Sequence, residues 1–245
     1  YETDVLISLP RIKTHGMMYY TGAIKNQFGC VPGTKKALWH TRMNNTHNFA
    51  KMLLDLNTLL QTDFAILDGI VAMEGNGPKS GDAKELNALV MGENLAAVDT
   101  VALSLIGYDD ATELPQYQVV KESGWGPYAL EQIDVLGERV ESLQCHDFAK
   151  VRKTNEIFGD KQSLRWIKNW IAPYPKLKEE KCIGCKICSE VCPERPQVIE
   201  MIEKDGKTIP EFDKNTCIRC FCCQEMCPVG AIEVGEPWLG KLLYR

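Results

Sequence analysis

The sequence predicts two folded parts, an α/β domain built as a layered sheet with helices and a small α+β domain rich in cysteine. Three observations support this division. Strand-like and helix-like segments alternate over the first part of the chain, eight of the eleven cysteines form a repeated pattern near the C-terminus, and a charged stretch closed by prolines separates the two regions. The expected boundaries are residues 1–144 for the α/β domain, 145–178 for a connector with a docking helix, 179–236 for the cysteine-rich domain and 237–245 for a C-terminal tail.

The first domain is expected to begin with a strand. Residues 4–9 have the pattern of a buried strand that Pro10 ends, and a loop rich in Lys, His, Gly and Asn follows. Residues 47–60 place apolar side chains at helical spacing, with Asn45 or Thr46 as the N-cap. Because nothing ahead of the first strand caps it, we expect an upstream stretch and a domain that is incomplete at its start. The other expected elements are buried strands at residues 64–70 and 86–92, a further strand at residues 132–138 and an apolar helix at residues 94–105.

The connector and the second domain carry local signals of their own. Leu164, Ile167 and Ile171 share one helical stripe before two prolines end it, so we expect a helix that docks the second domain. Asp205 and Gly206 stand between two strand-like segments and predict the turn of a β-hairpin.

Eight cysteines form two copies of the pattern C-x-x-C-x-x-C-x-x-x-C-P. The first copy contains Cys182, Cys185, Cys188 and Cys192, and the second contains Cys217, Cys220, Cys223 and Cys227. A thiolate at every third residue lets one short loop wrap a cubane, while the fourth cysteine of each copy points toward a second cluster. We therefore predict two [4Fe-4S] clusters with crossed ligation. One cluster is expected to bind Cys182, Cys185, Cys188 and Cys227, and the other Cys217, Cys220, Cys223 and Cys192.

The two cysteine segments also match each other beyond the cysteines. CIGCKICSEVCP aligns with CIRCFCCQEMCP, and VIEM at 198–201 aligns with AIEV at 231–234, as expected of an internal duplication with pseudo-two-fold symmetry. On these motifs, residues 179–236 resemble the bacterial-type two-cluster ferredoxins. Zinc knuckles are one alternative, but a four-ligand zinc site gains nothing from a third cysteine at the same spacing. A disulfide framework is another, but cysteines three residues apart would strain the bridge geometry.

Three cysteines lie outside the repeated pattern. Cys222 aligns with Ile187 of the other repeat, which favours a small buried hydrophobe over a ninth ligand. Cys30 and Cys145 have no metal-ligand spacing around them and are interpreted as structural thiols.

The first domain contains several separated motifs. They are LPRIKTHG at 9–16, TGAIKNQFG at 21–29, the loop with Lys35, Lys36 and His40, LDGIVAMEGNGPKSG at 67–81 and NLAAVDTVALSLIG at 94–107. In this order they resemble the domain-of-unknown-function family 362, over residues 3–108. The resemblance implies an architecture and a redox context, because members are often fused to a two-cluster ferredoxin but have no agreed reaction. Such proteins usually have a longer α/β region at their start.

Polar side chains gather in the loop that is expected to follow the first strand. They are Lys13, His15, Lys25 and Asn26, and Asn76 and Gly77 of a later glycine-rich loop complete the set. Ligands bind at such strand ends in open α/β sheets. We therefore predict a pocket for a carboxylate or a phosphate, in which the imidazole moves a proton. The candidate catalytic residues are His15, Lys13, Lys25 and Asp68, with Asp99 as a further candidate acid or base.

Structural alternatives exist for each part of this pocket. A lysine in a polar loop is usually solvated, residues 75–78 have the composition of an ordinary turn, and Asp99 within an apolar helix can serve as a cap or pair with a neighbour. A mononuclear metal site built from His15, His40, His47 and His146 has no spacing signature. A standard nucleotide fingerprint is absent from the sequence.

Composition limits the partners. The formal charge is −5, and eight thiolates with two cluster cores would bring it to roughly −9. Such an acidic protein disfavours nucleic acid and favours a redox partner protein with a basic docking face. No apolar run reaches the length of a membrane span, and reduced, cluster-bearing cysteines indicate a cytoplasmic location.

Three functions from different classes follow. In the first, the chain is an iron–sulfur oxidoreductase or its redox subunit, which passes electrons to a small anionic substrate or cofactor in the α/β domain. In the second, it is a ferredoxin-type electron carrier with a partner-docking domain. In the third, the α/β domain binds an anion or a metal while the clusters sense redox state.

Overall fold

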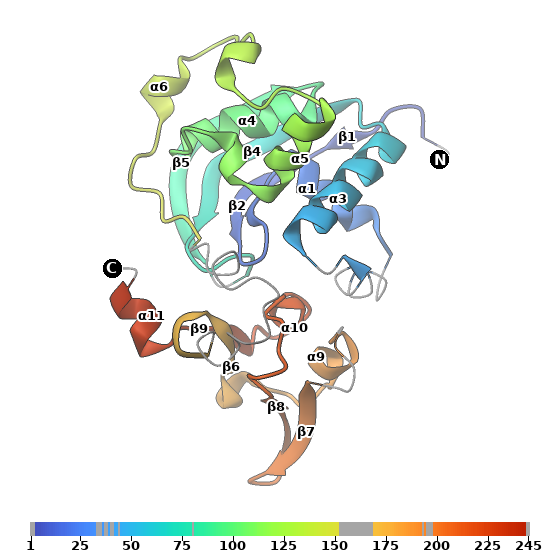
Figure 1. The fold of residues 1–245 in the computed structure, drawn as a ribbon, viewed down its shortest axis with the longest axis vertical. Helices are drawn as coiled ribbons and strands as arrows, with labels where there is room; N and C mark the ends of the chain where they lie inside the picture. Colours follow the sequence, from blue (N-terminus) through green and yellow to red (C-terminus); the bar gives the residue numbers. More distant parts are fainter. Residues whose placement is uncertain are drawn as a thin grey trace. The chain divides into compact units, whose positions relative to one another are not determined.

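The computed structural model describes residues 3–32, 36, 39, 42, 43, 45–79, 81–151, 169–192, 194 and 198–243. The chain forms two compact units, which Figure 1 draws in sequence colours. The first unit is made of residues 1–36, 43–77 and 81–151, and the second mainly of residues after 151. Each unit is described below by itself.

The first unit contains a mixed five-stranded sheet around one long central strand. The strands are β1 (Ile7–Ser8), β2 (Arg11–His15), β3 (Tyr19–Thr21), β4 (Phe64–Glu74) and β5 (Asp82–Gly92). β1 and β2 follow one another along one edge of β4, both parallel to it, and β3 pairs with β2 in the antiparallel direction. β5 pairs antiparallel with the other edge of β4 over almost its whole length. The expected α/β class is confirmed.

The chain remains extended beyond Pro10, contrary to the sequence expectation. We expected one strand at residues 4–9 that Pro10 ends, whereas β1 stops at Ser8 and β2 begins at Arg11. Pro10 has no N–H to donate, but its carbonyl accepts a hydrogen bond from Asp68 N at 2.8 Å. The proline therefore interrupts the strand without ending the pairing with β4. Residues 11–15 consequently lie in the sheet and not in a loop.

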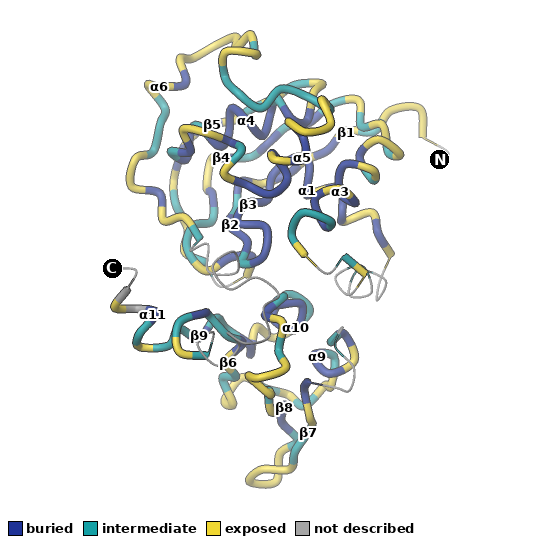
Figure 2. Tube along the Cα trace, in the orientation of Figure 1, coloured by how far each residue is buried: buried dark blue, intermediate teal, exposed yellow. Residues whose placement is uncertain are grey.

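Helices cover one face of this sheet. The main ones are α1 (Ala23–Asn26), α3 (Thr46–Leu60), α4 (Leu95–Leu105) and α5 (Pro115–Ser123). α4 packs on β4 and β5, and α3 packs against α5. Figure 2 shows most of α4 as buried, because apolar residues lie all around it. Shorter helical turns occur at Gln27–Cys30, Ala111–Glu113, Leu130–Gln132 and Val140–Leu143 (α6).

Side-chain caps begin the two long helices. Asn45 accepts a hydrogen bond from Asn48 N at 2.8 Å, which confirms Asn45 as the N-cap of α3. Asn94 accepts hydrogen bonds from Ala96 N and Ala97 N at 3.0 and 3.1 Å and caps α4 in the same way. Local sequence chemistry therefore determines where both helices begin.

The strand expected at residues 132–138 is wrong. This segment follows the short turn Leu130–Gln132 and forms no strand. The side chain of Gln132 accepts hydrogen bonds from Tyr128 N and Ala129 N at 2.9 and 3.2 Å, which tightens the turn. Gly137 has a φ of 109°, which is incompatible with an extended strand. The alternating apolar pattern here belongs to a surface segment.

The second unit contains two small antiparallel sheets and short helices. β6 (Tyr174–Leu177) pairs with β9 (Ile232–Gly235), and β7 (Ile199–Lys204) pairs with β8 (Lys207–Phe212). The helical segments are Glu179–Lys181, α9 (Ile187–Glu190), α10 (Cys222–Glu225) and α11 (Trp238–Leu243). β6 lies within the stretch that the sequence assigned to the connector.

The hairpin of this unit is the one that the sequence predicted. Asp205 and Gly206 join β7 to β8 and have φ values of 50° and 74°. Two successive residues with positive φ form the turn that matches the twist of a hairpin. Leu164 and Ile167, expected in a docking helix, lie outside the described residues, as do Lys35, His40 and Pro193.

Candidate metal centres

Two cavities in the second unit are lined by cysteine thiols. The first is lined by Cys182, Cys185, Cys188 and Cys227, together with apolar side chains that include Leu177, Met201 and Ile232. The second is lined by Cys192, Cys217, Cys220 and Cys223, together with apolar side chains that include Ile199 and Phe212. Each cavity takes three cysteines from one repeat and one from the other. Crossed ligation requires this grouping, and the ligand roles themselves stay a prediction.

The two repeats present their cysteines with the same backbone turns. Gly184 and Arg219 precede the second cysteine of each motif, with φ values of 66° and 61°. Lys186 and Phe221 follow it, with φ values of 65° and 59°. α9 and α10 then start at equivalent positions, so that the third thiol of each motif lies in the first turn of a short helix. The internal duplication seen in the sequence is therefore also a repeat of backbone conformation.

Burial raises the pKa of several of these thiols. It raises the pKa of Cys188 and of Cys217 to about 11, although the backbone N–H groups of Ser189 and Arg219 act to lower these two values. Ala231 N also donates a hydrogen bond to Cys227 Sγ, at 3.2 Å. Thiolates that ligate iron have lost this proton, and soft thiolate ligands suit iron–sulfur clusters. A cavity lined by cysteine thiols, with N–H groups directed at sulfur, therefore fits a cluster.

The cysteine thiols of the two cavities do not converge on the position of a single metal ion. Among the described residues, no three His, Cys, Asp or Glu side chains are arranged to hold a single metal ion. The cysteines instead line the walls of the two cavities. The mononuclear histidine site considered from the sequence is not formed by His15, His47 and His146, while His40 lies outside the described part of the chain.

Lys13 and His15 lie in β2, which corrects the expectation of a loop. Residues two apart on a strand point to the same face, so these side chains share one face of the sheet. His15 is 2% exposed, and its Nδ1 accepts hydrogen bonds from Met17 N and Met18 N at 3.1 and 3.2 Å. The imidazole therefore stabilises the turn between β2 and β3.

Lys25 and Asn26 lie in α1 and have separate partners. Asn26 Nδ2 donates a hydrogen bond to Ser8 Oγ at 3.0 Å. Lys25 is buried, and its Nζ lies 5.9 Å from the centre of the Phe28 ring. These contacts attach α1 to β1 and to the turn that follows the helix. A shared anion pocket with Lys13 stays a proposal.

The later glycine-rich loop approaches β2, as the sequence suggested. Gly77 N donates a hydrogen bond to Thr14 Oγ1 at 3.2 Å, and a Cβ on Gly77 would lie 2.1 Å from Thr14 O. Only glycine fits at this distance from the strand. Asn76, the neighbouring candidate, is exposed.

Asp68 lies in the middle of β4 and not at its end. Its Oδ2 accepts hydrogen bonds from Nε and Nη2 of Arg11 at 3.0 and 2.9 Å. The pKa of Asp68 is lowered, chiefly by the hydrogen bond from Ile70 N and also by Arg11, although burial acts in the opposite direction. A carboxylate held in its ionised form favours a surface ion pair over the role of a general acid.

Asp99 is the cap of α1, although it belongs to α4. Its Oδ1 accepts hydrogen bonds from Tyr20 Oη and Ala23 N at 2.9 and 2.6 Å, and its Oδ2 accepts one from Ile24 N at 2.9 Å. The N-cap residue itself is Gly22, where a Cβ would lie 2.0 Å from Asp99 Oδ1. This is the structural alternative that the sequence left open.

Asp99 is expected to make stability depend on pH. Burial raises its pKa from 3.8 to about 6, although its three hydrogen bonds act to lower the value. Because the pKa is raised in the folded state, the stabilising contribution is complete below pH 4 and is lost as the pH rises through 6. Between pH 5 and 7.5 the loss amounts to roughly 1 kcal/mol. Urea unfolding of the wild type and of Asp99→Asn at both pH values measures it, and equal pH dependence of the two proteins would contradict it.

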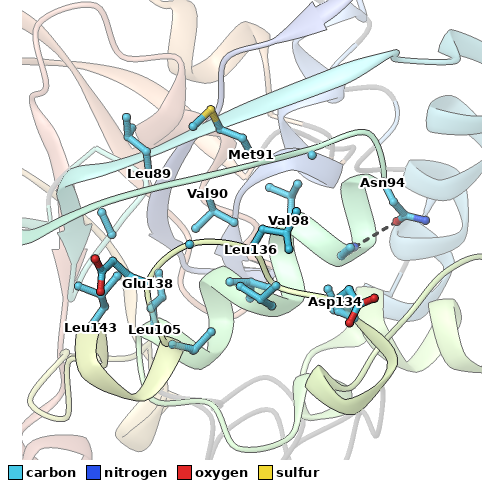
Figure 3. A pocket seen from close by; sticks show the side chains of 18 of the residues that line it. Leu89, Val90, Met91, Asn94, Val98, Leu105, Asp134, Leu136, Glu138 and Leu143 are labelled. Carbon is cyan, nitrogen blue, oxygen red and sulfur yellow. Dashed lines mark hydrogen bonds between the residues drawn. The ribbon is translucent and has the colours of Figure 1, made fainter.

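A separate groove of about 600 Å³ lies in the first unit, beside β5 and α4. Figure 3 shows Val90, Val98, Leu105 and Leu143 around it and the carboxylates of Asp134 and Glu138 near its rim. Asn94 also lines it, with its side chain engaged in capping α4. Its described lining contains none of the residues that the sequence proposed for ligand binding.

Arg219 is a further buried residue of the second cysteine motif that the sequence analysis did not single out. It is 1% exposed and lies close enough to Cys217 for its charge to influence that thiol. The available signal was the mismatch of Arg219 with Gly184 when the two repeats are aligned.

The fold and the thiol cavities define an iron–sulfur protein in which an α/β unit precedes a ferredoxin-type unit. Comparisons with known families agree with this. Residues 1–104 match the domain of unknown function DUF362, and residues 181–231 match the 4Fe-4S dicluster domain. Both resemblances inferred from the motifs are confirmed, in the expected order. The second match indicates [4Fe-4S] binding and supports iron–sulfur electron transfer.

One curated relative is the Thylakoid-associated protein sll1697 of Synechocystis sp. (strain ATCC 27184 / PCC 6803 / Kazusa). It is 39% identical over 131 residues, which are 53% of this chain and 40% of that protein. The chain therefore spans less than half of the length of this relative. Among the described residues, no helix combines the length and apolar character that crossing a membrane requires.

Proposed function

We propose that this protein transfers electrons through two [4Fe-4S] clusters, one in each cysteine cavity. The observation that carries the proposal is the grouping of the eight thiols, three from one repeat and one from the other around each cavity. When bound, such clusters supply one-electron redox chemistry. The fourth cysteine of each repeat reaches the cavity of the other repeat and so ties the two centres together, which suits the passage of an electron between them.

The chain surrounds each cluster site with apolar side chains and directs hydrogen bonds at the cysteine sulfur atoms. Apolar side chains such as Met201 and Phe212 complete the cavity walls and exclude water. N–H groups such as Ala231 N point at sulfur and stabilise its negative charge. These two effects act in opposite directions on a cluster potential, because burial disfavours the more negative reduced state and hydrogen bonds favour it.

A carrier role is favoured over direct catalysis in the first unit. His15 is occupied by backbone N–H groups, Asp68 by Arg11 and Asp99 by the start of α1. The residues proposed for acid–base chemistry are thus engaged in structural contacts. The first unit is proposed to dock a redox partner with a basic surface, in the cytoplasm, where thiols stay reduced.

An oxidoreductase, or the redox subunit of one, is the second candidate. The observation that favours it is the shared sheet face of Lys13 and His15, which offers a cation and an imidazole side by side. In this version, electrons from the clusters reduce a small anionic substrate or cofactor held by the first unit. Redox sensing coupled to anion or metal binding is the remaining alternative.

Electron transfer to cytochrome c, a basic one-electron acceptor, tests the proposal. The reduced protein is expected to reduce cytochrome c in a stopped-flow experiment, at a rate that falls several-fold between low and high salt. Lys13→Ala should transfer electrons as fast as the wild type and as Lys51→Ala, a control on an exposed lysine of α3. A cluster-loaded protein that passes no electrons would contradict the carrier role. A loss confined to Lys13→Ala would contradict the absence of a role for this lysine in electron transfer.

A further inference from the structure

The two cysteine repeats differ at one position between their first and second cysteines. Gly184 and Arg219 occupy this position with nearly the same φ, 66° and 61°. A Cβ on Gly184 would lie 2.8 Å from Thr208 O, so the first repeat has no room for a side chain there. The second repeat instead accommodates a complete arginine side chain, which is only 1% exposed.

The guanidinium of Arg219 has only neutral hydrogen-bond partners among the described residues. Nη1 donates to Ala172 O and Pro173 O at 2.7 and 2.8 Å. Nη2 donates to Asn169 Oδ1 and Lys214 O at 2.5 and 3.5 Å. All four acceptors are carbonyl oxygens, so these contacts orient the group and leave its positive charge uncompensated.

A buried cation without a counter-charge is strongly unfavourable. Nε of Arg219 is also buried and has no hydrogen-bond partner in the described part of the chain. The residue stands between Cys217 and Cys220, and its charge acts on Cys217. Four thiolates around an iron–sulfur core carry a net negative charge in both redox states. The cluster of the second cavity is therefore the counter-charge that this arginine lacks.

We propose that Arg219 is the counter-ion of the cluster in the second cavity and raises its reduction potential above that of the cluster in the first cavity. The inference rests on the proposed two-cluster function. Reduction adds one negative charge, which a buried positive charge stabilises strongly because screening in the interior is weak. Gly184 provides no such buried charge to the first cavity. Lys186, which lines the first cavity, and Glu194, which lines the second, both reach solvent, and solvent screens their charges. When the pair of clusters holds a single electron, that electron therefore resides mainly on the cluster of the second cavity.

Arg219→Gln tests this inference by removing the charge while keeping a hydrogen-bonding side chain. Potentiometric titration of the purified protein, followed by EPR, is expected to show that the equilibrium constant for reduction of one cluster falls at least tenfold. A tenfold change corresponds to about 59 mV for a one-electron couple. The other cluster should change less than threefold. Arg219→Lys, which keeps the charge, should remain closer to the wild type than Arg219→Gln does.

Lys186→Gln is the matched control. Lys186 is a cation beside the second cysteine of the first motif, with a similar φ of 65°, but its side chain is exposed. Solvent screens its charge, so both potentials should change less than threefold. A shift as large as that of Arg219→Gln would overturn the argument from burial.

Iron content separates this inference from the proposed function. Fewer than two clusters in the wild type would overturn both, whereas two clusters in Arg219→Gln with unchanged potentials would overturn only the role of Arg219. If Arg219→Gln does not assemble, the half-reduced wild type decides by paramagnetic NMR. Reduced-cluster shifts on the β-protons of Cys217, Cys220 and Cys223 would support the inference, and such shifts on Cys182, Cys185 and Cys188 would overturn it.

Discussion

Cys192→Ala is expected to destroy the cluster of the second cavity, although Cys192 belongs to the first repeat. The reason is that Cys192 lines the same cavity as Cys217, Cys220 and Cys223. Iron should fall from about eight per chain to about four, or to about seven if a three-iron cluster remains in the second cavity. Cys227→Ala should in the same way destroy the cluster of the first cavity, which Cys227 lines although it belongs to the second repeat.

EPR of the reduced variants identifies which cluster is lost. Crossed ligation predicts that Cys192→Ala gives the spectrum of Cys217→Ala, and that Cys227→Ala gives the spectrum of Cys182→Ala. Cys222→Ala is the matched control, because Cys222 is buried in the same motif but aligns with Ile187 and lines neither cavity. It should retain full iron content. Ligation within each repeat would instead make Cys192→Ala resemble Cys182→Ala.

Asp99→Ala is expected to lower the free energy of unfolding by roughly 3 kcal/mol or more. The change leaves Tyr20 Oη, Ala23 N and Ile24 N without the acceptor that they share in the wild type. Each buried donor without a partner costs about 1–3 kcal/mol. Because Asp99 joins α4 to the start of α1, the whole first unit should be affected.

Asp68→Ala provides the comparison for this loss. Asp68 also accepts hydrogen bonds from a side chain and a backbone N–H, but on an exposed part of the sheet. Its removal should cost less than about 1 kcal/mol, as is usual for exposed ion pairs. Urea unfolding followed by tryptophan fluorescence measures both values. Equal losses in the two variants would contradict the structural role assigned to Asp99.

Local chemistry explains the parts of the structure that the sequence predicted well. The N-cap Asn45 and the turn at Asp205 and Gly206 depend on a few adjacent residues, so the sequence contains the whole signal. The cysteine grouping is also largely local, since the spacing of three residues determines which thiols share a loop. The crossing of the fourth cysteines followed from the position of each at the far end of its motif.

Contacts between distant segments explain what the sequence did not reveal. The strand continues beyond Pro10 because the proline carbonyl accepts a hydrogen bond from Asp68 N, and Asp99 caps a helix more than seventy residues earlier in the chain. The sequence predicted His15 to carry a proton. Its actual partners are the backbone N–H groups of Met17 and Met18, which a pattern of side chains does not reveal. The proposed anion pocket relied on a loop that proved to be part of the sheet.

Iron and acid-labile sulfide analysis of the anaerobically purified protein, with EPR of the dithionite-reduced form, tests the two-cluster account most directly. The account predicts about eight irons and eight sulfides per chain and two interacting [4Fe-4S]⁺ signals. About four irons per chain, or bound zinc in place of iron, would contradict it and the electron-transfer function with it.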